Sequence, residues 1–265
     1  MSAIPKTREP ILLREDRDGV ATLTLNRPEQ YNALSGAMLD ELQAAFDALA
    51  RDASVRVVVI AARGRGFCAG HDLKEIGALG TQKKIEALFQ QCGRMMMSIV
   101  SLPQPVIAKV HATATAAGCQ LVAQCDLAVA ADSAKFAVSG VNFGLFCSTP
   151  SVALARNVGR KQAMEMLLTG EFIDAPTAKA YGLVNRVVPA AELDAEVDRV
   201  AALVASKPQG AVAAGKRLFY RQLEMGLEGA YKIAGEVISC NAASDEGREG
   251  IAAFAEKRKP VWNKK

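Results

Sequence analysis

Short apolar runs and amphipathic segments alternate along the first 190 residues of this 265-residue chain. The runs at residues 20–25, 57–61 and 106–110 are rich in β-branched residues and are typical of buried strands. Between them, apolar residues recur three and four positions apart, as Met38, Leu42 and Phe46 do, which predicts amphipathic helices. The alternation predicts an α/β fold in which a largely parallel sheet, or a spiral of strands, carries the helices.

The expected elements follow from these periods and from their Gly, Pro and capping boundaries. Strands are expected at residues 11–13, 20–25, 57–61, 106–110, 126–131, 135–138 and 183–188, the first two forming a hairpin. Helices are expected at residues 35–51, 81–101, 119–124, 161–169 and 174–181, with another beginning at Thr149-Pro150.

Beyond Pro189 the strand pattern stops, and helices are expected at residues 191–206, 210–225, 227–243 and 245–257. This change is the one domain boundary that the pattern predicts. It divides the chain into residues 1–190, where strands and helices alternate, and residues 191–265, which are expected to be entirely helical.

Composition narrows the class of protein. Half of the residues are apolar and the net charge is only +4, which indicates a folded domain and argues against nucleic acid as a partner. The six cysteines show no Cys-x-x-Cys spacing, so neither a metal site nor a disulfide framework is expected. Charged residues interrupt the longest apolar region, and residues 1–18 lack a secretory signal. We expect no membrane association and a cytoplasmic location, or the mitochondrial matrix in a eukaryote, although the sequence shows no clear transit peptide.

A glycine-rich stretch at residues 62–73 connects the strand at 57–61 to a charged segment that begins at Asp72. A strand that turns into a helix start leaves backbone N–H groups unpaired, and such groups bind an anion or a developing oxyanion. The pattern of strand, small-residue turn and helix recurs at residues 106–124. The two turns are expected to face each other across one site.

Several motifs occur in a fixed order along almost the whole chain. They are Asn26-Arg27-Pro28-Glu29, Asn32-Ala33-Leu34, Phe67-Cys68-Ala69-Gly70-His71-Asp72-Leu73, Ala117-Gly118-Cys119-Gln120-Leu121, Leu168-Thr169-Gly170 and Phe254-Ala255-Glu256-Lys257-Arg258. This succession resembles the crotonase, or enoyl-CoA hydratase/isomerase, superfamily, and within it the group of enoyl-CoA hydratase domain-containing protein 3.

The resemblance implies a ClpP-like crotonase spiral of β-β-α units with a C-terminal helical trimerisation region, assembled as a homotrimer or a dimer of trimers. It implies an acyl-CoA thioester as the ligand, with coenzyme A entering as part of the substrate and no separate cofactor. The N–H groups of His71 and Ala117 would form the oxyanion hole. Residues implied to contact or support the substrate are Arg27, Ala33, Leu34, Phe67, Ala69, Gly70, Asp72, Leu73, Gly118 and Cys147, with Phe254 and Lys257 approaching from a neighbouring subunit.

Two positions depart from the hydratase pattern. Hydratases of the family use two glutamates, and this chain has Gln120 and Gly140 at the matching positions. Neither side chain can exchange a proton near neutral pH, so paired carboxylate catalysis by these positions is excluded. The expected chemistry therefore rests on the oxyanion hole.

Three alternatives stay open at this point. Val141-Asn142-Phe143-Gly144 resembles a loop of family members that decarboxylate malonyl-type thioesters, and a thioesterase or a catalytically silent acyl-CoA binder is also compatible. His71 could act as a base as well as through its N–H, and Cys147 as a nucleophile or merely a buried thiol. His111 is expected to be a satisfied turn or core histidine.

Overall fold

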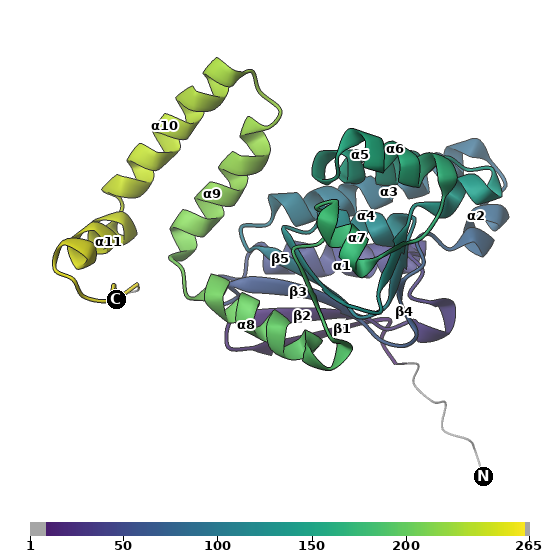
Figure 1. Cartoon of the computed structure of the whole chain (residues 1–265), viewed down its shortest axis with the longest axis horizontal. Coiled ribbons are helices and arrows are strands. Elements are labelled where there is room, and N and C mark those ends of the chain that lie inside the picture. Colours follow the sequence, from purple (N-terminus) through teal and green to yellow (C-terminus); the bar gives the residue numbers. More distant parts are fainter. Residues whose placement is uncertain (1–8, 263–265) are drawn as a thin grey trace, which may run out of the picture.

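Two sheets form the centre of the molecule, of which we describe residues 9–262 from a computed structural model (Figure 1). The larger sheet has the strand order β1-β2-β3-β5-β7-β10 and is parallel except for the β1–β2 hairpin. Its strands are β1 (Leu12–Arg17), β2 (Val20–Leu25), β3 (Val57–Ala62), β5 (Val106–Val110), β7 (Leu127–Ala131) and β10 (Arg186–Val188).

The smaller sheet has the order β4-β6-β8-β9. Its strands are β4 (Gly66–Cys68), β6 (Thr113–Thr115), β8 (Lys135–Ala137) and β9 (Ile173–Asp174). Residues 66–68 and 113–115 were expected to be turns, and here the sequence prediction is wrong. Three residues are too few to show an alternating pattern, and these strands form because β4 and β6 pair with each other.

A β-β-α unit repeats along the chain, as the family resemblance implied. Each time, one strand of the larger sheet is followed by one of the smaller sheet and then by helices. The helices of the three units are α2 (Leu73–Leu79) and α3 (Gln82–Ser101) after β4, α4 (Ala117–Gln124) after β6, and α5 (Ser148–Asn157) and α6 (Arg160–Thr169) after β8. The helix α1 (Gly36–Leu49) precedes the first unit, and α7 (Ala175–Ala180) follows the last. The crotonase fold is thereby confirmed.

Both faces of the larger sheet are covered by helices. Val58 and Ile60 belong to the main core with α1, α3 and α4, whereas Val57 and Val59 point to the opposite face. There they contact buried side chains of α8 (Leu193–Ala205). The alternation follows from the two-residue period of a strand, and it makes α8 part of the sheet's packing although it lies beyond residue 190.

The helices α9 (Gln209–Gln222), α10 (Leu227–Ala243) and α11 (Asp245–Ala255) extend away from the sheets (Figure 1). A buried cluster anchors α9 to the core. The Lys216 ammonium donates to Asp126 at 2.6 Å and to the carbonyls of Ile99 and Gln104 at 2.8 and 2.9 Å. Tyr220 donates to the other Asp126 oxygen at 2.8 Å. Burial lowers the pKa of Lys216, an effect that Asp126 opposes.

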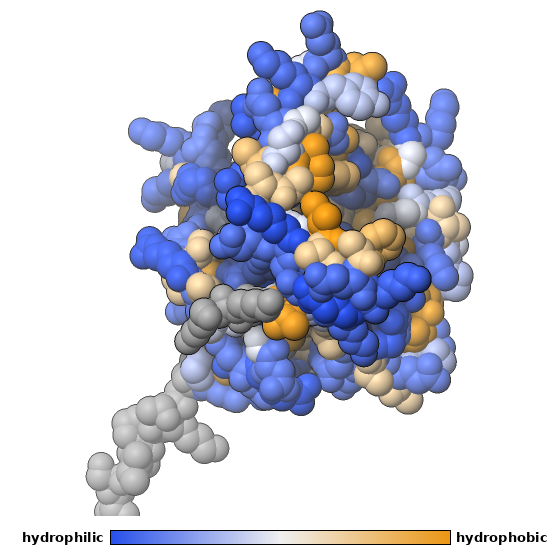
Figure 2. All heavy atoms as spheres, turned by 90° about the vertical axis from the view of Figure 1, so that its left-hand side faces the viewer, coloured by the Kyte–Doolittle hydropathy of each residue, from blue (hydrophilic) through white to orange (hydrophobic). Residues whose placement is uncertain are grey.

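Large apolar side chains on α9–α11 are left uncovered in the single chain. Leu227, Tyr231 and Phe254 are each at least 74% exposed. Figure 2 looks onto this end of the molecule and shows apolar side chains gathered among charged ones. The other large apolar side chains exposed on these helices are Phe219, Ile238 and Ile251.

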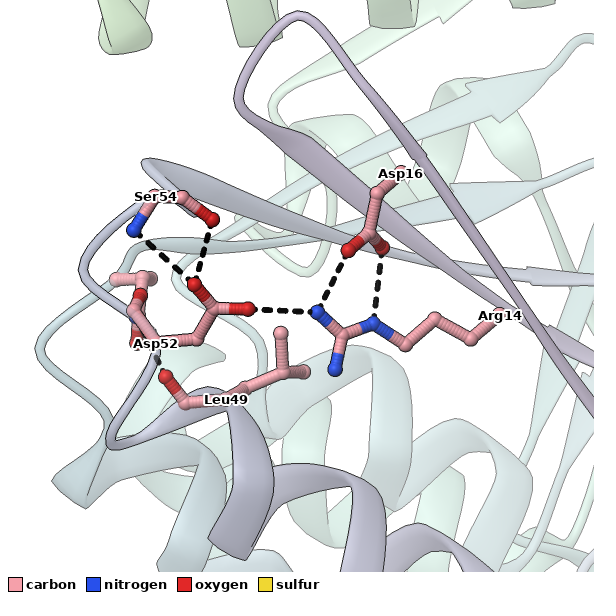
Figure 3. A network of polar contacts seen from close by, with 6 residues as sticks. Arg14, Asp16, Leu49, Asp52 and Ser54 are labelled. Atoms are coloured by element: carbon pink, nitrogen blue, oxygen red, sulfur yellow. Dashed lines mark hydrogen bonds and ion pairs between the residues drawn. The ribbon is translucent and has the colours of Figure 1, made fainter.

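A polar network fixes the edge strand β1 to the loop after α1 (Figure 3). The Arg14 guanidinium donates to Asp16 at 2.9 and 2.6 Å and to Asp52 at 2.9 Å. Ser54 also donates to Asp52, and its hydroxyl and then Arg14 lower the pKa of that carboxyl. The network thus joins the first strand of the sheet to the loop that follows α1.

The prediction about a leader concerns residues 1–18, of which residues 1–8 lie outside the described part. In residues 9–262, no helix is long and apolar enough to span a bilayer.

Candidate active site

The first glycine turn carries the N–H of His71. Gly70 has φ +87°, and a Cβ there would lie 2.9 Å from the Ala116 Cβ and 3.0 Å from the Ala117 nitrogen. The N–H of Leu34 donates to the Gly70 carbonyl at 2.7 Å, and that of Asp72 to the Leu34 carbonyl at 3.4 Å. These bonds hold the turn on both sides of His71, whose own N–H has no acceptor among the described residues.

Asn32 stabilises this turn by hydrogen bonds to the backbone that precedes it. It is fully buried with φ +54°, a left-handed conformation that Asn tolerates better than most residues. Its amide donates to the carbonyls of Arg63 and Gly66 at 2.8 and 2.9 Å and accepts from the Arg27 N–H at 2.9 Å. One side chain thus links the Asn26–Leu34 motif to the glycine turn.

The second turn delivers the N–H of Ala117. Ala116 has φ +49° and ψ −120°, which is strained for a residue with a Cβ, and its N–H donates to the Ala137 carbonyl at 2.9 Å. Ala117 begins α4, so its N–H has no partner within the helix and none among the described residues. The positive end of the α4 dipole adds to this donor.

The two turns are in direct contact. A Cβ at Gly118 would lie 2.1 Å from the Cys68 carbonyl oxygen, so only glycine lets α4 approach β4 this closely. The Thr115 hydroxyl donates to the Ala69 carbonyl at 3.0 Å. Together with the contact of Gly70 against Ala117, these interactions place the two unpaired N–H donors side by side.

A cavity of about 920 Å³ opens in front of the two turns. Its walls come from the turns, from α2 and α3, and from residues 139–150, which include the short 3₁₀ helix at Ser139–Phe143. The lining is mainly apolar, and Glu86 is the only charged side chain among the described residues that form it. Within residues 9–262, no group of three His, Cys, Asp or Glu residues could hold a metal ion.

The His71 ring lines this cavity beside Phe89, with an edge-to-face contact and 4.8 Å between ring centroids. Its Nε2 is buried without a hydrogen-bond partner among the described residues. Burial lowers the pKa of His71 to about 4, so the imidazole is neutral at pH 7.

Gly140 and Gln120 occupy different surroundings. Gly140 lines the cavity, where a Cβ would lie 2.4 Å from the Leu145 carbonyl and 2.8 Å from the Cys147 sulfur. The Gly140 N–H donates to that sulfur at 3.2 Å. The loop therefore already fills the place that a side chain at position 140 would take. Gln120 is buried on α4, and its Oε1 has no hydrogen-bond partner within the described part of the chain.

The Cys147 thiol lines the cavity but stays protonated at neutral pH. Burial raises its pKa, against a smaller opposing effect of the Gly140 N–H. These conditions fit a packed thiol better than a nucleophile.

The structure brings six of the predicted residues to the cavity wall: Ala69, His71, Leu73, Ala117, Gly140 and Cys147. Others lie behind the wall and support it. The Arg27 guanidinium donates to the Ala33 carbonyl and to Asp72, which caps α2. The remaining supporting residues are Leu34, Phe67, Gly70, Gly118 and Gln120.

Phe254 and Lys257 do not line this cavity; they lie on α11 and just after it, at the end of the molecule opposite α2 (Figure 1). In the adjoining basic segment, Arg258 pairs with Glu249 and Glu256. The His111 Nε2–H donates to the Gly64 carbonyl at 2.9 Å, as expected of a satisfied turn histidine.

Four cavity residues on α3 were missed: Gln82, Ile85, Glu86 and Phe89. Their signal was present, because Gln82, Ile85, Glu86 and Phe89 share one helix face at spacings of three and four. The sequence could not say which side of the helix at 81–101 would face a ligand.

The fold and the paired donors identify the class of protein. Residues 15–265 match the enoyl-CoA hydratase/isomerase family, and the chain belongs to it.

Individual proteins with names from this family are similar to the chain in sequence and in structure. The chain is 47% identical over 253 residues to the Xenopus laevis enoyl-CoA hydratase domain-containing protein 3, mitochondrial, covering 96% of this chain and 86% of that protein. A crystal structure of human enoyl-CoA hydratase domain-containing protein 3 has a TM-score of 0.93 and 47% identity, covering 96% of this chain and all of that one. A crystal structure of a Mycobacterium smegmatis enoyl-CoA hydratase has a TM-score of 0.95 and 58% identity, covering 96% and 99%.

Proposed function

We propose that the protein acts on an acyl-CoA thioester by binding its carbonyl oxygen between the N–H groups of His71 and Ala117. The observation that carries this proposal is the pair of unpaired donors, which two contacting turns aim at one cavity. Coenzyme A enters as part of the substrate.

Fixed N–H donors stabilise the charge that develops on a thioester oxygen. An enolate or a tetrahedral intermediate places a full negative charge there, and each donor contributes about 3 to 4 kcal/mol to its stabilisation. The neutral His71 ring and the apolar wall keep water and competing cations away from the oxyanion. The site thus suits any reaction that passes through such a charge.

The proposal includes the loss of the standard hydratase mechanism, with Gln120 and Gly140 at the positions of the two glutamates. The packing of Cys147 and Leu145 against Gly140 supports it, because no carboxylate fits there without moving the loop. Decarboxylation is the second candidate. Its first step needs only an oxyanion hole and a pocket that disfavours a carboxylate, which the apolar lining provides.

We further propose that the chain assembles as a homotrimer or a dimer of trimers through residues 191–265. The exposed apolar side chains on α9–α11 support this, since a lone chain would leave them in water. In that assembly Phe254 and Lys257 of one subunit would approach the acyl-CoA of another. Light scattering gives the mass, and a monomer at micromolar concentration would contradict the proposal.

The functional test incubates the protein with crotonyl-, malonyl-, methylmalonyl- and long-chain acyl-CoAs, and mass spectrometry identifies the products. Ala117→Pro removes one donor, and proline is tolerated at the first position of a helix. We expect its turnover to fall by roughly 10²- to 10³-fold while the circular dichroism spectrum is kept.

If the proline variant does not fold, lactate in place of Ala117 removes the N–H by substituting an ester oxygen. Unchanged turnover in a folded variant would contradict the oxyanion assignment. Rapid hydration of crotonyl-CoA by the wild-type protein would contradict the loss of the hydratase mechanism, and binding without turnover of any thioester would favour the silent binder.

A further inference from the structure

Five large apolar side chains line the cavity and are nevertheless exposed to solvent. They belong to Leu73 on α2, to Phe143, Leu145 and Phe146 in the loop before α5, and to Phe172 just before β9, and each is between 47 and 67% exposed. Side chains of this size are unfavourable in water, and a group of them on one surface is typical of a place where an apolar ligand binds.

Three of these side chains, Phe143, Phe146 and Phe172, form what we call the aromatic rim. A contact between two chain segments brings the rim together. Gly170 has φ +64°, and a Cβ there would lie 2.9 Å from the Asn142 amide nitrogen, which donates to the Gly170 carbonyl at 3.4 Å. Phe143 directly follows Asn142, and Phe172 is two residues beyond Gly170. Both segments therefore present phenylalanines to one cavity.

The cavity is large for a short acyl group. Its volume of about 920 Å³ lies near the upper end of the roughly 300 to 1,000 Å³ that is usual for sites enclosing a drug-sized ligand. Apart from the rim, Ile76 on α2 and Ile85 and Phe89 on α3 make the wall apolar. A crotonyl group would leave much of this surface in water, whereas a long aliphatic chain would cover it.

We propose that the protein prefers thioesters of long aliphatic acids and that the aromatic rim determines this preference. The inference rests on the proposed function, because a carbonyl held by the N–H groups of His71 and Ala117 places the start of the acyl chain in the cavity. The pantetheine arm of coenzyme A suits the rim less well. Its amide groups need hydrogen-bond partners, which phenylalanine side chains do not offer and an aliphatic chain does not require.

The preference has a predictable size. Each methylene group that leaves water completely on binding lowers the dissociation constant about fourfold, and one that is half covered lowers it about twofold. Because the rim is partly open to solvent, we expect values between these limits. The effect belongs to the acyl chain alone, so it is measured as a ratio between thioesters that share the same coenzyme A.

The test titrates the full-length protein with butyryl-, octanoyl- and dodecanoyl-CoA in a calorimeter, at concentrations too low for micelles. For the wild type, we expect the dissociation constant to fall by about two- to fourfold per methylene between butyryl- and octanoyl-CoA. In Phe143→Ser and in Phe172→Ser, the ratio of the butyryl-CoA to the dodecanoyl-CoA constant is expected to fall by roughly 10-fold. Met97→Ser, 57% exposed on α3 and outside the cavity, is the matched control and should keep the wild-type ratio.

The outcomes separate this inference from the proposed function. If the thioesters bind equally well, or if the rim variants weaken all of them by one factor, the rim does not hold the acyl chain; the inference is then overturned and the acyl-CoA proposal stands. If none of the thioesters binds, both fail.

The rim could instead contact a second copy of the chain, and light scattering on the variants decides this. A smaller mass in Phe143→Ser or Phe172→Ser would overturn the inference. A lowered ratio in both variants, with the mass kept and Met97→Ser unchanged, supports it. The two phenylalanines lie on separate segments, so if one variant does not fold, the other still provides the test.

Discussion

The cavity has two walls that differ in how firmly they are built. The donor wall, residues 69–72 and 115–118, is held by backbone hydrogen bonds and by glycines that touch a neighbouring backbone. The loop wall, residues 139–149, carries Phe143, Leu145 and Phe146, which are 67, 50 and 47% exposed. One wall is anchored in the smaller sheet and the other lies at the surface.

This difference separates two parts of catalysis. Stabilising an oxyanion requires donors fixed to within a fraction of an ångström, and the donor wall supplies the necessary rigidity. Proton transfer depends on one side chain at a time, which a surface loop or a helix face can gain or lose at little structural cost. Related proteins can therefore keep the oxyanion donors and differ in the side chain that transfers the proton.

The largest effect is expected from Gly118→Ala, which breaks the donor wall. The added Cβ would lie 2.1 Å from the Cys68 carbonyl oxygen and 2.7 Å from its carbon, and neither backbone can move freely. We expect a loss of about 3 kcal/mol or more in the free energy of unfolding, measured by urea titration at fixed protein concentration.

Gly93→Ala is the matched control, because nothing lies within 4 Å of its Cβ and it sits inside α3. There, alanine is expected to add roughly 0.5 to 1 kcal/mol through helix propensity. Equal free energies of unfolding for Gly118→Ala and Gly93→Ala would contradict the clash expected at Gly118, and with it the rigidity assigned to the donor wall.

A smaller effect is expected from Gly140→Ala, the same change made in the loop wall. The added Cβ would lie 2.4 Å from the Leu145 carbonyl oxygen, a clash almost as close as the one at Gly118. That carbonyl, however, belongs to an exposed loop that can shift. We expect a loss of about 1 kcal/mol in the same titration. A loss as large as that of Gly118→Ala would show that the loop wall is as rigid as the donor wall.

The smallest change in the free energy of unfolding is expected from Ala116→Gly, which should stabilise the protein and not destabilise it. Glycine relieves about 1 to 2 kcal/mol of strain at φ +49° but gains roughly 0.4 to 1 kcal/mol of conformational freedom in the unfolded chain. The net gain is about 0 to 1.6 kcal/mol, seen as a higher urea midpoint. A clear loss of stability would mean that the Ala116 methyl contributes packing that exceeds the strain.

Sequence reasoning succeeded where the signal was local. The strands at residues 57–61 and 106–110 were predicted because most of their residues are buried on both faces of a sheet and so form apolar runs, the second interrupted only by Lys109. The turn at Gly70 was predicted from its small residues. The three-residue strands β4 and β6 were not, because their pairing depends on residues about 45 positions apart.

The place of Glu86 in the cavity wall was hidden for a related reason. Lys83, Lys84 and Glu86 together are typical of a solvated helix face. Only the packing of α3 against the donor wall, through Phe89 and His71, turns that face toward a cavity. A helix's own sequence does not specify what will stand opposite it.

The buried cluster of Lys216, Asp126 and Tyr220 has a consequence for how the chain can be divided. A chain ending at residue 190 would keep every strand, yet it would leave the Asp126 carboxylate without its cation and two carbonyls without their donor. It would also uncover Val57 and Val59. A shortened chain therefore keeps this cluster only if it extends past Tyr220, and gene fusions or exchanges between relatives should be joined in the turn before α10.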